Sequence, residues 1–349
     1  MLTSKIWALG AEMATQTGYK ASELGMIPLD WDIVEFEEIC QIRKQKVNPL
    51  FQSGEFCVEL EHLEPETGLL LGNTVTKPNS SIKTVFQNGD VLFGKLRAYL
   101  RKYWLANQDG VCSTEIWAFV ATNKAINPFL FYVVQTEQFI KAASEAYGTH
   151  MPRSDWNVVK NYLLPLPPLP EQTAIATALS DTDALISSLQ TLIAKKQAVK
   201  LAAMQNLLSG KIRLPEFAKR PDGSPKTTRQ TELGCVPEDW EVVKLGSVAF
   251  IKTGSKNNQD KKENGQYPFF VRSATVEQID TYSYDCEAIL IPGEGNIGSI
   301  FHYINGKFDA HQRVYVIRDF YNVIGKFVFF ALKQNFGKHA MENTVKATV

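Results

Sequence analysis

A stretch of thirteen residues occurs twice in this chain, and the two copies lie far apart. Residues 22–34 read Ser-Glu-Leu-Gly-Met-Ile-Pro-Leu-Asp-Trp-Asp-Ile-Val, and residues 231–243 read Thr-Glu-Leu-Gly-Cys-Val-Pro-Glu-Asp-Trp-Glu-Val-Val. Seven of the thirteen positions are identical, at a constant offset of 209 residues. Solenoid repeats recur about every 20–50 residues, so this much longer period indicates that a whole domain has been duplicated.

The sequence between the two copies predicts one long helix. Residues 171–210 contain no proline and no glycine before Gly210, which stands where a helix-ending glycine is expected. Apolar residues recur in steps of three, four and seven, the pattern of an amphipathic helix of coiled-coil type. About 40 residues at a rise of 1.5 Å extend roughly 60 Å. We expect a partner-binding face formed by Ile175, Leu179, Leu185, Ile186, Leu189, Leu192, Ile193, Met204 and Leu208.

The predicted fold class is α/β of the α+β type, with two duplicated mixed-sheet domains separated by the long helix. We expect the first domain over residues 1–168 and the helix over 169–214. A polar linker rich in Pro and Gly is expected over 215–230, and the second domain over 231–349.

Several elements are predicted inside the first domain. An Asn-Gly turn at residues 87–89 is flanked by strands at 82–86 and 90–93, and residues 116–120 form another strand-like run. A helix is expected to open at Asn127, with proline at its first position, and to continue through Ile140. The prolines of residues 163–170 exclude helix and favour an extended segment.

The second domain repeats part of this pattern. Residues 285–291 correspond to the strand at 90–93, and residues 321–332 correspond to the helix at 129–139. With this correspondence, the chain stops near the equivalent of residue 154. We therefore expect the counterpart of residues 155–214, including a second long helix, to be missing, through natural shortening or because the chain is a fragment.

Composition narrows the class of protein. Lys plus Arg and Asp plus Glu both number 37, so the net charge is zero, which weakly disfavours DNA as a partner and leaves only local patches to contact it. Five scattered cysteines without a C-x-x-C pair argue against a disulfide framework or a zinc site and fit a reducing compartment. No signal peptide and no apolar run of about 18 residues is present, so we expect a cytoplasmic protein that does not enter a membrane.

The densest basic cluster lies at residues 94–104, which hold four cations, three aromatic residues and no acid. Arginine can read guanine, lysine and arginine can hold phosphates, and tyrosine can donate to phosphate. The candidate DNA contacts here are Lys95, Arg97, Tyr99, Arg101 and Lys102. The competing interpretation is one solvated strand face, because charged and aromatic residues alternate along it.

A second set of candidate DNA contacts lies in the second domain. Its members are Lys252, Ser255, Lys256, Arg272, Asn296, His311, Gln312 and Arg313. His311 alone is more often a structural histidine than a base contact. The sequence therefore leaves both roles open for that residue.

No catalytic machinery is recognisable. Gly293, Gly295 and Gly298 match a dinucleotide-binding pattern, but strand-like alternation follows them where such a site needs a helix, so we predict a loop between two strands. A phosphate-binding lysine loop, a nucleophile elbow, a zinc-protease motif and an Asn/Asp-Pro-Pro-Tyr/Phe run are all absent from the sequence. We predict a protein that binds and does not catalyse.

Three features together resemble the specificity (S) subunit of type I restriction–modification enzymes. They are the duplicated Glu-Leu-Gly-x-x-Pro-x-x-Trp opening, the Gly-Lys-Leu-Arg-Ala-Tyr-Leu-Arg-Lys run at residues 94–102, and Leu-Pro-Pro-Leu-Pro-Glu-Gln at 166–172 before the long helix. The resemblance implies that each globular domain reads one half of a split, asymmetric site in double-stranded DNA. It also implies that antiparallel helices set the gap between the halves.

The same resemblance implies partners and cofactors. Two methyltransferase (M) subunits would dock along the domains and helices, and restriction (R) subunits would add cleavage. S-adenosylmethionine, Mg and ATP are expected only in those partners, with no cofactor or metal here. Because family members carry a second long helix, Leu185, Leu189 and Leu192 would lack their partner. Each exposed large apolar residue costs roughly 1.5–3 kcal/mol, so the isolated chain is expected to self-associate or to need its M subunit.

Two other classes of function compete with DNA recognition. One is a protein–protein scaffold whose duplicated domains bind peptides and whose helix separates them, which a neutral charge permits. The other is a nucleotide-dependent enzyme that uses the glycine-rich loop. The recognised bases are not encoded in any of these motifs, because base readout depends on where side chains lie in space.

Overall fold

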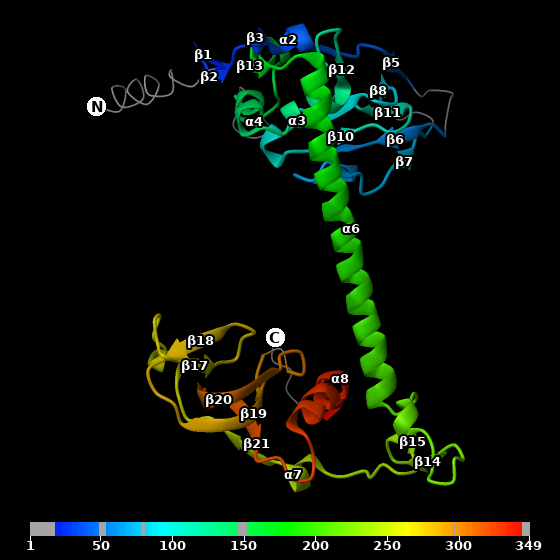
Figure 1. Ribbon diagram of the computed structural model, residues 1–349, viewed down its shortest axis with the longest axis vertical. Coiled ribbons are helices and arrows are strands. Elements are labelled where there is room, and N and C mark those ends of the chain that lie inside the picture. Colours follow the sequence, from blue (N-terminus) through cyan, green and yellow to red (C-terminus); the bar gives the residue numbers. More distant parts are fainter. Residues whose placement is uncertain (1–17, 49–53, 78–80, 146–151, 296, 344–349) are drawn as a thin grey trace. The chain divides into compact units, whose positions relative to one another are not determined.

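The computed structural model describes residues 18–48, 54–77, 81–145, 152–295 and 297–343. The chain divides into two compact units, Met1–Ser188 and Leu189–Val349, and the 40-residue helix α6 (Leu169–Leu208) continues from the first into the second (Figure 1). None of the helices in the described part of the chain has the length and apolar character of a membrane span.

The first unit contains two sheets. Across one of them the strands are β10 (Tyr103–Leu105), β9 (Val91–Gly94), β12 (Ile116–Ala121) and β4 (Cys40–Ile42). Across the other they are β5 (Lys46–Val47), β8 (Lys83–Phe86), β11 (Gly110–Ser113), β6 (Phe56–Val58) and β7 (Thr74–Val75). Strands β6 and β11 run parallel, whereas the neighbours in the first sheet are antiparallel.

Short helices and two further strand pairs complete this unit. The helices are α2 (Phe36–Ile39), α3 (Asn127–Val133), α4 (Glu137–Ser144) and α5 (Trp156–Val159), with 3-10 turns η1 (Leu60–His62) and η2 (Ala98–Leu100). Strand β1 (Tyr19–Ser22) pairs with β2 (Gly25–Pro28), and β3 (Asp32–Glu35) pairs with β13 (Leu163–Leu166). The last pair brings the chain back to the start of α6.

The central strands are buried on both faces because they separate two cores. Phe93 and Phe119 belong to the core that includes α2, α3 and α4, whereas their neighbours Leu92 and Ala118 belong to a core shared with the second sheet. Successive residues of a strand point to opposite faces, so a strand with a core on each side must be apolar throughout. This explains the uninterrupted apolar run at residues 116–120, whose predicted strand is confirmed as β12.

The second unit holds one six-stranded sheet and a C-terminal helix. Its strands, in order across the sheet, are β16 (Phe250–Thr253), β21 (Val314–Arg318), β19 (Tyr284–Pro292), β20 (His302–Ala310), β17 (Tyr267–Phe270) and β18 (Val276–Ile279). Its remaining elements are η3 (Pro215–Phe217), β14 (Thr228–Thr231), β15 (Gly234–Pro237), α7 (Leu245–Val248), η4 (Asn258–Asp260) and α8 (Gly325–Asn343).

Both units have the same topology, as the duplicated sequence predicted. Strands β16, β21, β19 and β20 repeat the order and antiparallel pairing of β4, β12, β9 and β10. Strand β17 runs parallel to the end of β20, as β6 does to β11. The cores match too, because successive residues of β19 belong to different cores. Ile289 packs in a core that includes residues of α8, whereas Leu290 packs in a core formed by residues of the sheet strands.

The repeated thirteen residues begin with the same hairpin in each unit. The hydroxyls of Ser22 and Thr231 donate to the carbonyls of Gly25 and Gly234, at 2.6 and 2.8 Å. Those two glycines have φ values of 106° and 94°, a left-handed backbone that favours glycine. The Ser/Thr-Glu-Leu-Gly pattern is therefore repeated because one tight turn is built twice.

The predicted turn at residues 87–89 is confirmed, but its flanking strands belong to different sheets. The amide of Asp90 donates to the carbonyl of Gln87 at 3.0 Å, and Gly89 has a φ of 88°. Strand β8 before the turn pairs with β11, whereas β9 after it pairs with β10 and β12. In the second unit the corresponding strand, β19, passes through without a break.

The helix expected from Asn127 through Ile140 is wrong in its extent, because it is split in two. Helix α3 ends at Val133, and α4 begins after Thr136, whose hydroxyl accepts a hydrogen bond from the amide of Phe139 at 3.3 Å. Asn127 is the first residue of α3 and not its cap, since its side chain accepts from the amide of Ala121 at 2.7 Å. A local cap therefore outweighs the continuous apolar pattern.

Two other expectations need correction at one end. Residues 163–166 are extended as predicted, but α6 already begins at Leu169, with Pro170 in its first turn, where a missing amide costs nothing. Helix α8 begins at Gly325 and not at Tyr321. The long helix itself is confirmed, and Gly210 has the left-handed φ of 70° expected of a helix-ending glycine.

Candidate DNA-recognition surface

The basic cluster of the first unit lies on a loop between β9 and β10. The interpretation of this segment as a strand face is wrong, because Arg97 and Arg101 adopt left-handed φ values of 55° and 51° on either side of η2. The loop backbone is fixed, since the amide of Lys95 donates to Glu115 at 3.0 Å and the amide of Arg97 donates to Pro152 at 2.9 Å. A fixed backbone can hold its side chains at defined positions.

The five candidate side chains of this loop fall into two groups. Arg101 donates to both carboxylate oxygens of Glu137 at 2.6 Å, which raises the pKa of the guanidinium, and the amine of Lys102 donates to the carbonyl of Leu60 at 2.5 Å. Lys95, Arg97 and Tyr99 have no side-chain hydrogen bond or ion pair to another described residue, and Tyr99 is 53% exposed. Those three side chains are available to a ligand.

In the second unit, four strand ends meet around a hollow of about 360 Å³. Its lining includes Arg272 after β17, Glu294 after β19 and His311 after β20. Arg313, which precedes β21, reaches the same place because it donates to Glu294 at 2.5 Å, while Arg272 donates to that carboxylate at 3.1 Å. The structure thus brings three of the predicted residues together with an acid that the sequence analysis did not single out.

His311 is 5% exposed and fixed in this cluster. Its ring nitrogen Nδ1 accepts a hydrogen bond from the amide of Arg313 at 3.0 Å. Burial, and then the charges of Arg272 and Arg313, lower the pKa of His311, so the ring is neutral near pH 7. The geometry matches the structural role of this residue, although His311 also belongs to the lining of the hollow.

The remaining candidates of the second unit lie beside the cluster or away from it. Lys256 is 4.0 Å from the buried carboxylate of Asp309, and its carbonyl accepts from the amide of Gln312 at 2.8 Å. Ser255 is exposed next to it. Lys252 is exposed on the edge strand β16, opposite Val316. Asn296 lies outside the described residues.

Equivalent strand ends carry different charges in the two units. Glu115 immediately precedes β12, as Arg313 precedes β21, and it pairs with Arg153 at 2.9 Å. Glu59 follows β6, as Arg272 follows β17, and it pairs with Lys83 at 2.5 Å. The loop after β9 carries Lys95 and Arg97, whereas the loop after β19 carries Glu294 and glycines with φ values of 79° and 80°. One scaffold therefore presents two different chemical surfaces.

The long helix is anchored to the first unit by the two residues that end the Pro-Pro-Leu-Pro-Glu-Gln run. Glu171 accepts a hydrogen bond from the indole of Trp31 at 2.9 Å. Gln172, fully buried, donates to the carbonyls of Lys124 and Pro167 at 2.9 and 2.8 Å and accepts from an amide. Neither role was predicted from the sequence, although a polar pair at the start of an apolar helix is a recognisable signal.

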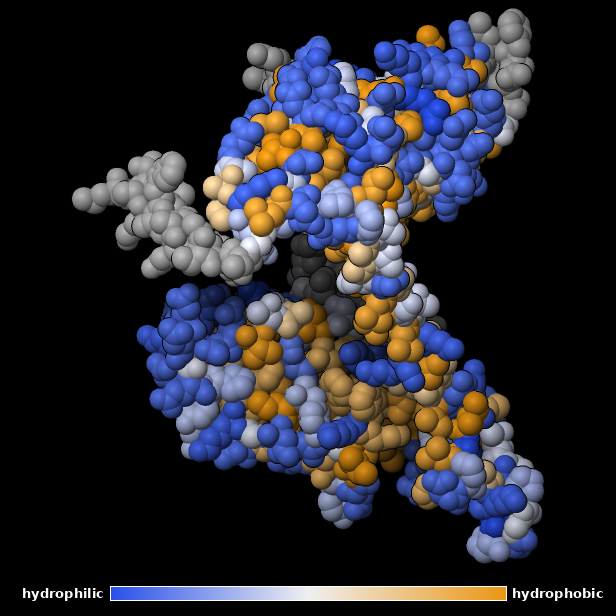
Figure 2. Space-filling model, turned by 45° about the horizontal axis from the view of Figure 1, so that its top comes forward, coloured by the Kyte–Doolittle hydropathy of each residue, from blue (hydrophilic) through white to orange (hydrophobic). Residues whose placement is uncertain are grey.

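The predicted helix face is exposed beyond this anchor. Ile175 packs on the first core, and Leu179 lines an apolar cavity of about 470 Å³ with Trp31. Figure 2 shows apolar residues, in orange, on the exposed surface of the helix. Exposed fractions lie between 48 and 59% for Leu185, Ile186, Leu189, Leu192 and Ile193, whereas Met204 and Leu208 are half-buried near the end.

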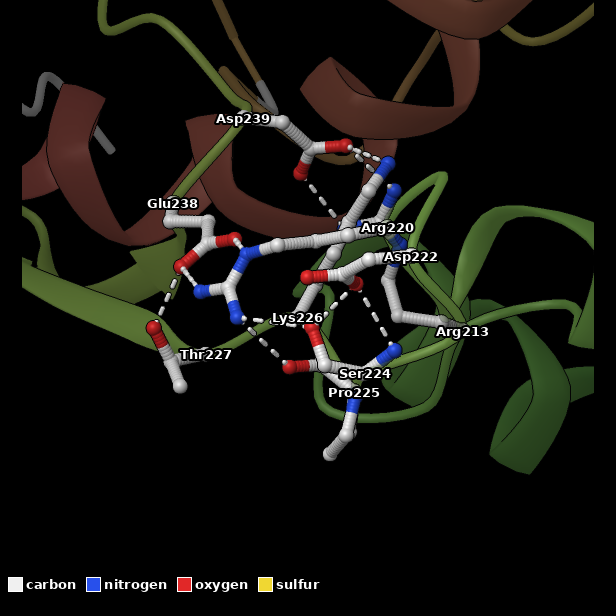
Figure 3. Close-up of polar contacts among 9 residues, drawn as sticks. All are labelled: Arg213, Arg220, Asp222, Ser224, Pro225, Lys226, Thr227, Glu238 and Asp239. Atoms are coloured by element: carbon white, nitrogen blue, oxygen red, sulfur yellow. Dashed lines mark hydrogen bonds and ion pairs between the residues drawn. The ribbon is translucent and has the colours of Figure 1, made fainter.

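The end of the helix is fastened to the second copy of the repeat by two acids that stand next to each other in the sequence (Figure 3). Asp239 accepts from Arg213 and Lys226, both at 2.6 Å. Glu238 accepts from Arg220 at 2.6 and 2.8 Å and also from Thr227. These bonds lower the pKa values of both acids, that of Glu238 to about 2 with Arg220 as the main cause. The segment 215–230, expected as a linker, supplies three of the four partners in this clamp, namely Arg220, Lys226 and Thr227.

Comparison with known proteins places this fold in a family. The model of the type I restriction modification DNA specificity domain matches residues 28–195 and 237–348. The chain is 29% identical over 234 residues to the type I restriction enzyme MjaVIII specificity subunit of Methanocaldococcus jannaschii, covering 65% of this chain and 51% of that one. It is 37% identical over 105 residues to the EcoDI specificity subunit of Escherichia coli, covering 30% and 23%. The chain thus spans about half the length of the first relative and less of the second.

Solved structures share the fold. An S subunit of a type I restriction-modification system from M. genitalium superposes with a TM-score of 0.56 at 16% identity, covering 90% of this chain and 80% of that one. The HsdS subunit from Thermoanaerobacter tengcongensis gives 0.50 at 20% identity, covering 92% and 83%. Because the family model matches both duplicated regions and the relatives agree with it, the chain belongs to the type I restriction modification DNA specificity domain family.

Proposed function

We propose that this chain is the noncatalytic recognition subunit of a type I restriction–modification complex and that each globular unit reads one half of a bipartite, asymmetric site in double-stranded DNA. The main support for this proposal is that two units of one topology present different charged side chains at equivalent strand ends. Side chains at the ends of strands can reach base edges while the sheet stays rigid. Two unlike surfaces then imply two unlike half-sites.

The helix α6 is proposed to set the spacing of the half-sites and to dock methyltransferase subunits. Its exposed apolar residues, such as Leu185 and Leu189, support a partner surface, because a solvated helix gains nothing from apolar residues at coiled-coil spacing. Methylation and cleavage, together with S-adenosylmethionine, Mg and ATP, belong in this proposal to the methyltransferase and restriction subunits. The cytoplasm of a prokaryote is the expected location.

The salt dependence of DNA binding tests the contact surface of the first unit. Lys95→Gln and Arg97→Gln should each reduce the slope of log affinity against log salt by about one unit, because each removes one phosphate contact. Arg101→Gln is the matched control in the same loop and should change the slope less, because Glu137 already holds Arg101. Equal slopes for the wild type and all three variants would remove this loop from the interface.

A competition experiment separates DNA recognition from a scaffold role. The full chain with its methyltransferase subunits is mixed with labelled duplexes of random sequence and excess unlabelled DNA. Retention of a subset of sequences is expected for a recognition subunit. A complex that assembles normally but retains no duplex would contradict the proposal.

A further inference from the structure

Glu294 holds two arginines at once in the second unit. Its Oε2 atom accepts from Arg272 at 3.1 Å and from Arg313 at 2.5 Å, and all three side chains are about half-exposed. Arg313, as the stronger partner, and then Arg272 lower the pKa of Glu294, so the carboxylate stays ionised near neutral pH. The three residues follow or precede three different strands of one sheet, and Arg272 and Glu294 line one hollow.

Arg272, Glu294 and Arg313 are called the triad. No described neighbouring side chain other than Glu294 balances the charge of the two arginines. His311, which lines the same hollow, is neutral near pH 7, because burial and both arginines lower its pKa. Glu277, which also lines the hollow, pairs with Lys261 at 3.5 Å. Among the described acids, Glu294 is the one with an ion pair to these arginines. The triad therefore carries one net positive charge, although it contains two guanidinium groups.

DNA offers the triad two kinds of partner. Phosphate oxygens are acceptors only, so they can satisfy the arginines but must lie beside the carboxylate, which they repel. A major-groove edge offers acceptors such as guanine N7 and O6 together with the donor amino groups of cytosine N4 or adenine N6. A carboxylate between two arginines thus has a favourable partner at a base edge and none at the backbone.

We propose that Glu294 is a specificity-determining residue that competes with DNA for Arg272 and Arg313 and is compensated only where a base edge donates an amino hydrogen to it. The inference rests on the proposed function and adds to it the chemistry of one contact. Backbone contacts at random sequence are weakened by Glu294. Binding to a half-site that presents acceptors beside an exocyclic amino group is not weakened by Glu294.

Glu294→Gln tests this role because glutamine keeps the shape of the side chain and removes its charge. The variant should bind a duplex of arbitrary sequence about two- to fivefold more tightly, the range typical of an exposed ion pair. The slope of log affinity against log salt should steepen by up to one unit, since the arginines become free for phosphates. Discrimination between a duplex enriched from a random pool by the wild type and an arbitrary duplex should fall by at least the same factor.

Asp319→Asn provides the matched control. Asp319 forms an exposed ion pair with Arg318 at the far end of β21 from Arg313, so the variant also removes one paired carboxylate of this unit. It should leave arbitrary-sequence affinity unchanged. All proteins are measured as full chains with their methyltransferase subunits, and equal melting temperatures of the wild type and Glu294→Gln confirm that the variant is folded.

Two outcomes overturn the inference in distinguishable ways. If the wild type binds and selects DNA but Glu294→Gln behaves as Asp319→Asn does, Glu294 does not guard the arginines and the proposed function stands. If the wild type selects no DNA at all, the proposed function fails and the inference fails with it.

Discussion

The indole nitrogen of Trp31 donates a hydrogen bond of 2.9 Å to Glu171, which ties the first repeated segment to the first turn of the long helix. The equivalent Trp240 makes different contacts, with the guanidinium of Arg213 5.8 Å from its ring and the ring of Phe327 6.3 Å away, edge to face. The same repeated tryptophan therefore fastens the start of α6 in one unit and the segment after its end in the other.

A double-mutant cycle measures the first of these attachments. Trp31→Phe and Glu171→Ala should each lower the free energy of unfolding, and the two losses should be non-additive by about 1 kcal/mol, the value of a partly exposed hydrogen bond. Urea unfolding followed by fluorescence or circular dichroism gives all four values. Simple additivity would show that the bond contributes nothing to stability.

Gln172→Ala should be more damaging than a change at any exposed position of the same helix. It leaves the buried carbonyl of Pro167, the partly buried carbonyl of Lys124 and one amide without their partner, and each unsatisfied buried group costs about 1–3 kcal/mol. We expect a loss of about 2–4 kcal/mol after local rearrangement or entry of water. The exposed Gln190→Ala should change the free energy of unfolding by less than about 0.5 kcal/mol. Similar urea midpoints for the two variants would contradict this anchoring role.

The clamp at the helix end should weaken in acid. The pKa of Glu238 is lowered to about 2, and that of Asp239 is lowered as well, so both acids hold fewer protons when folded than when unfolded. Their stabilising effect is then present above about pH 4.5 and is lost as the pH falls towards the folded pKa values.

Glu238→Gln combined with Asp239→Asn mimics the protonated pair and tests that window. The double variant should melt a few degrees lower than the wild type at pH 7, and the difference should shrink steadily as the pH falls from about 4.5 towards 2. Glu241→Gln, at an exposed neighbour without an ion pair to any described residue, should melt as the wild type does. A difference that does not depend on pH would assign the clamp no electrostatic role.

The exposed face of α6 should make the isolated chain associate. Leu185, Leu189 and Leu192 are 48–59% exposed, and covering them in an oligomer or against a methyltransferase subunit removes apolar area from water. Size-exclusion chromatography with light scattering should show oligomers or aggregates of the chain alone. Replacing all three by Gln should restore a monomer, whereas Thr191→Gln should not. A wild-type chain that is monomeric at every concentration would contradict this expectation.

The sequence was most informative where local chemistry decides the structure. The duplication, the long helix and the turn at residues 87–89 follow from residue patterns that few alternative folds satisfy. Thr136 and Glu137 form a typical helix start, so the sequence does contain a signal for the break between α3 and α4. The apolar pattern that continues around them favours one unbroken helix, which is why the break was not predicted.

Contacts between distant residues could not be predicted in this way. From the sequence, Arg101 is expected to be an unpaired cation in a basic run, but it forms an ion pair with Glu137, 36 residues later. Glu294 reads as part of a glycine-rich loop, and only the packing of β17, β19 and β21 places it between two arginines. Charge in a sequence therefore marks candidates, whereas the fold decides which of them are already paired.

Selection of duplexes from a random pool by the complete complex tests the central claim most directly. We predict an enriched motif of two unequal blocks separated by a fixed gap of unspecified base pairs. Arg272→Gln with Arg313→Gln should degrade one block and leave the other intact, whereas Arg97→Gln, which removes a phosphate contact, should weaken binding without changing either block. A single continuous block, or no enrichment by a complex that is correctly assembled, would contradict the account.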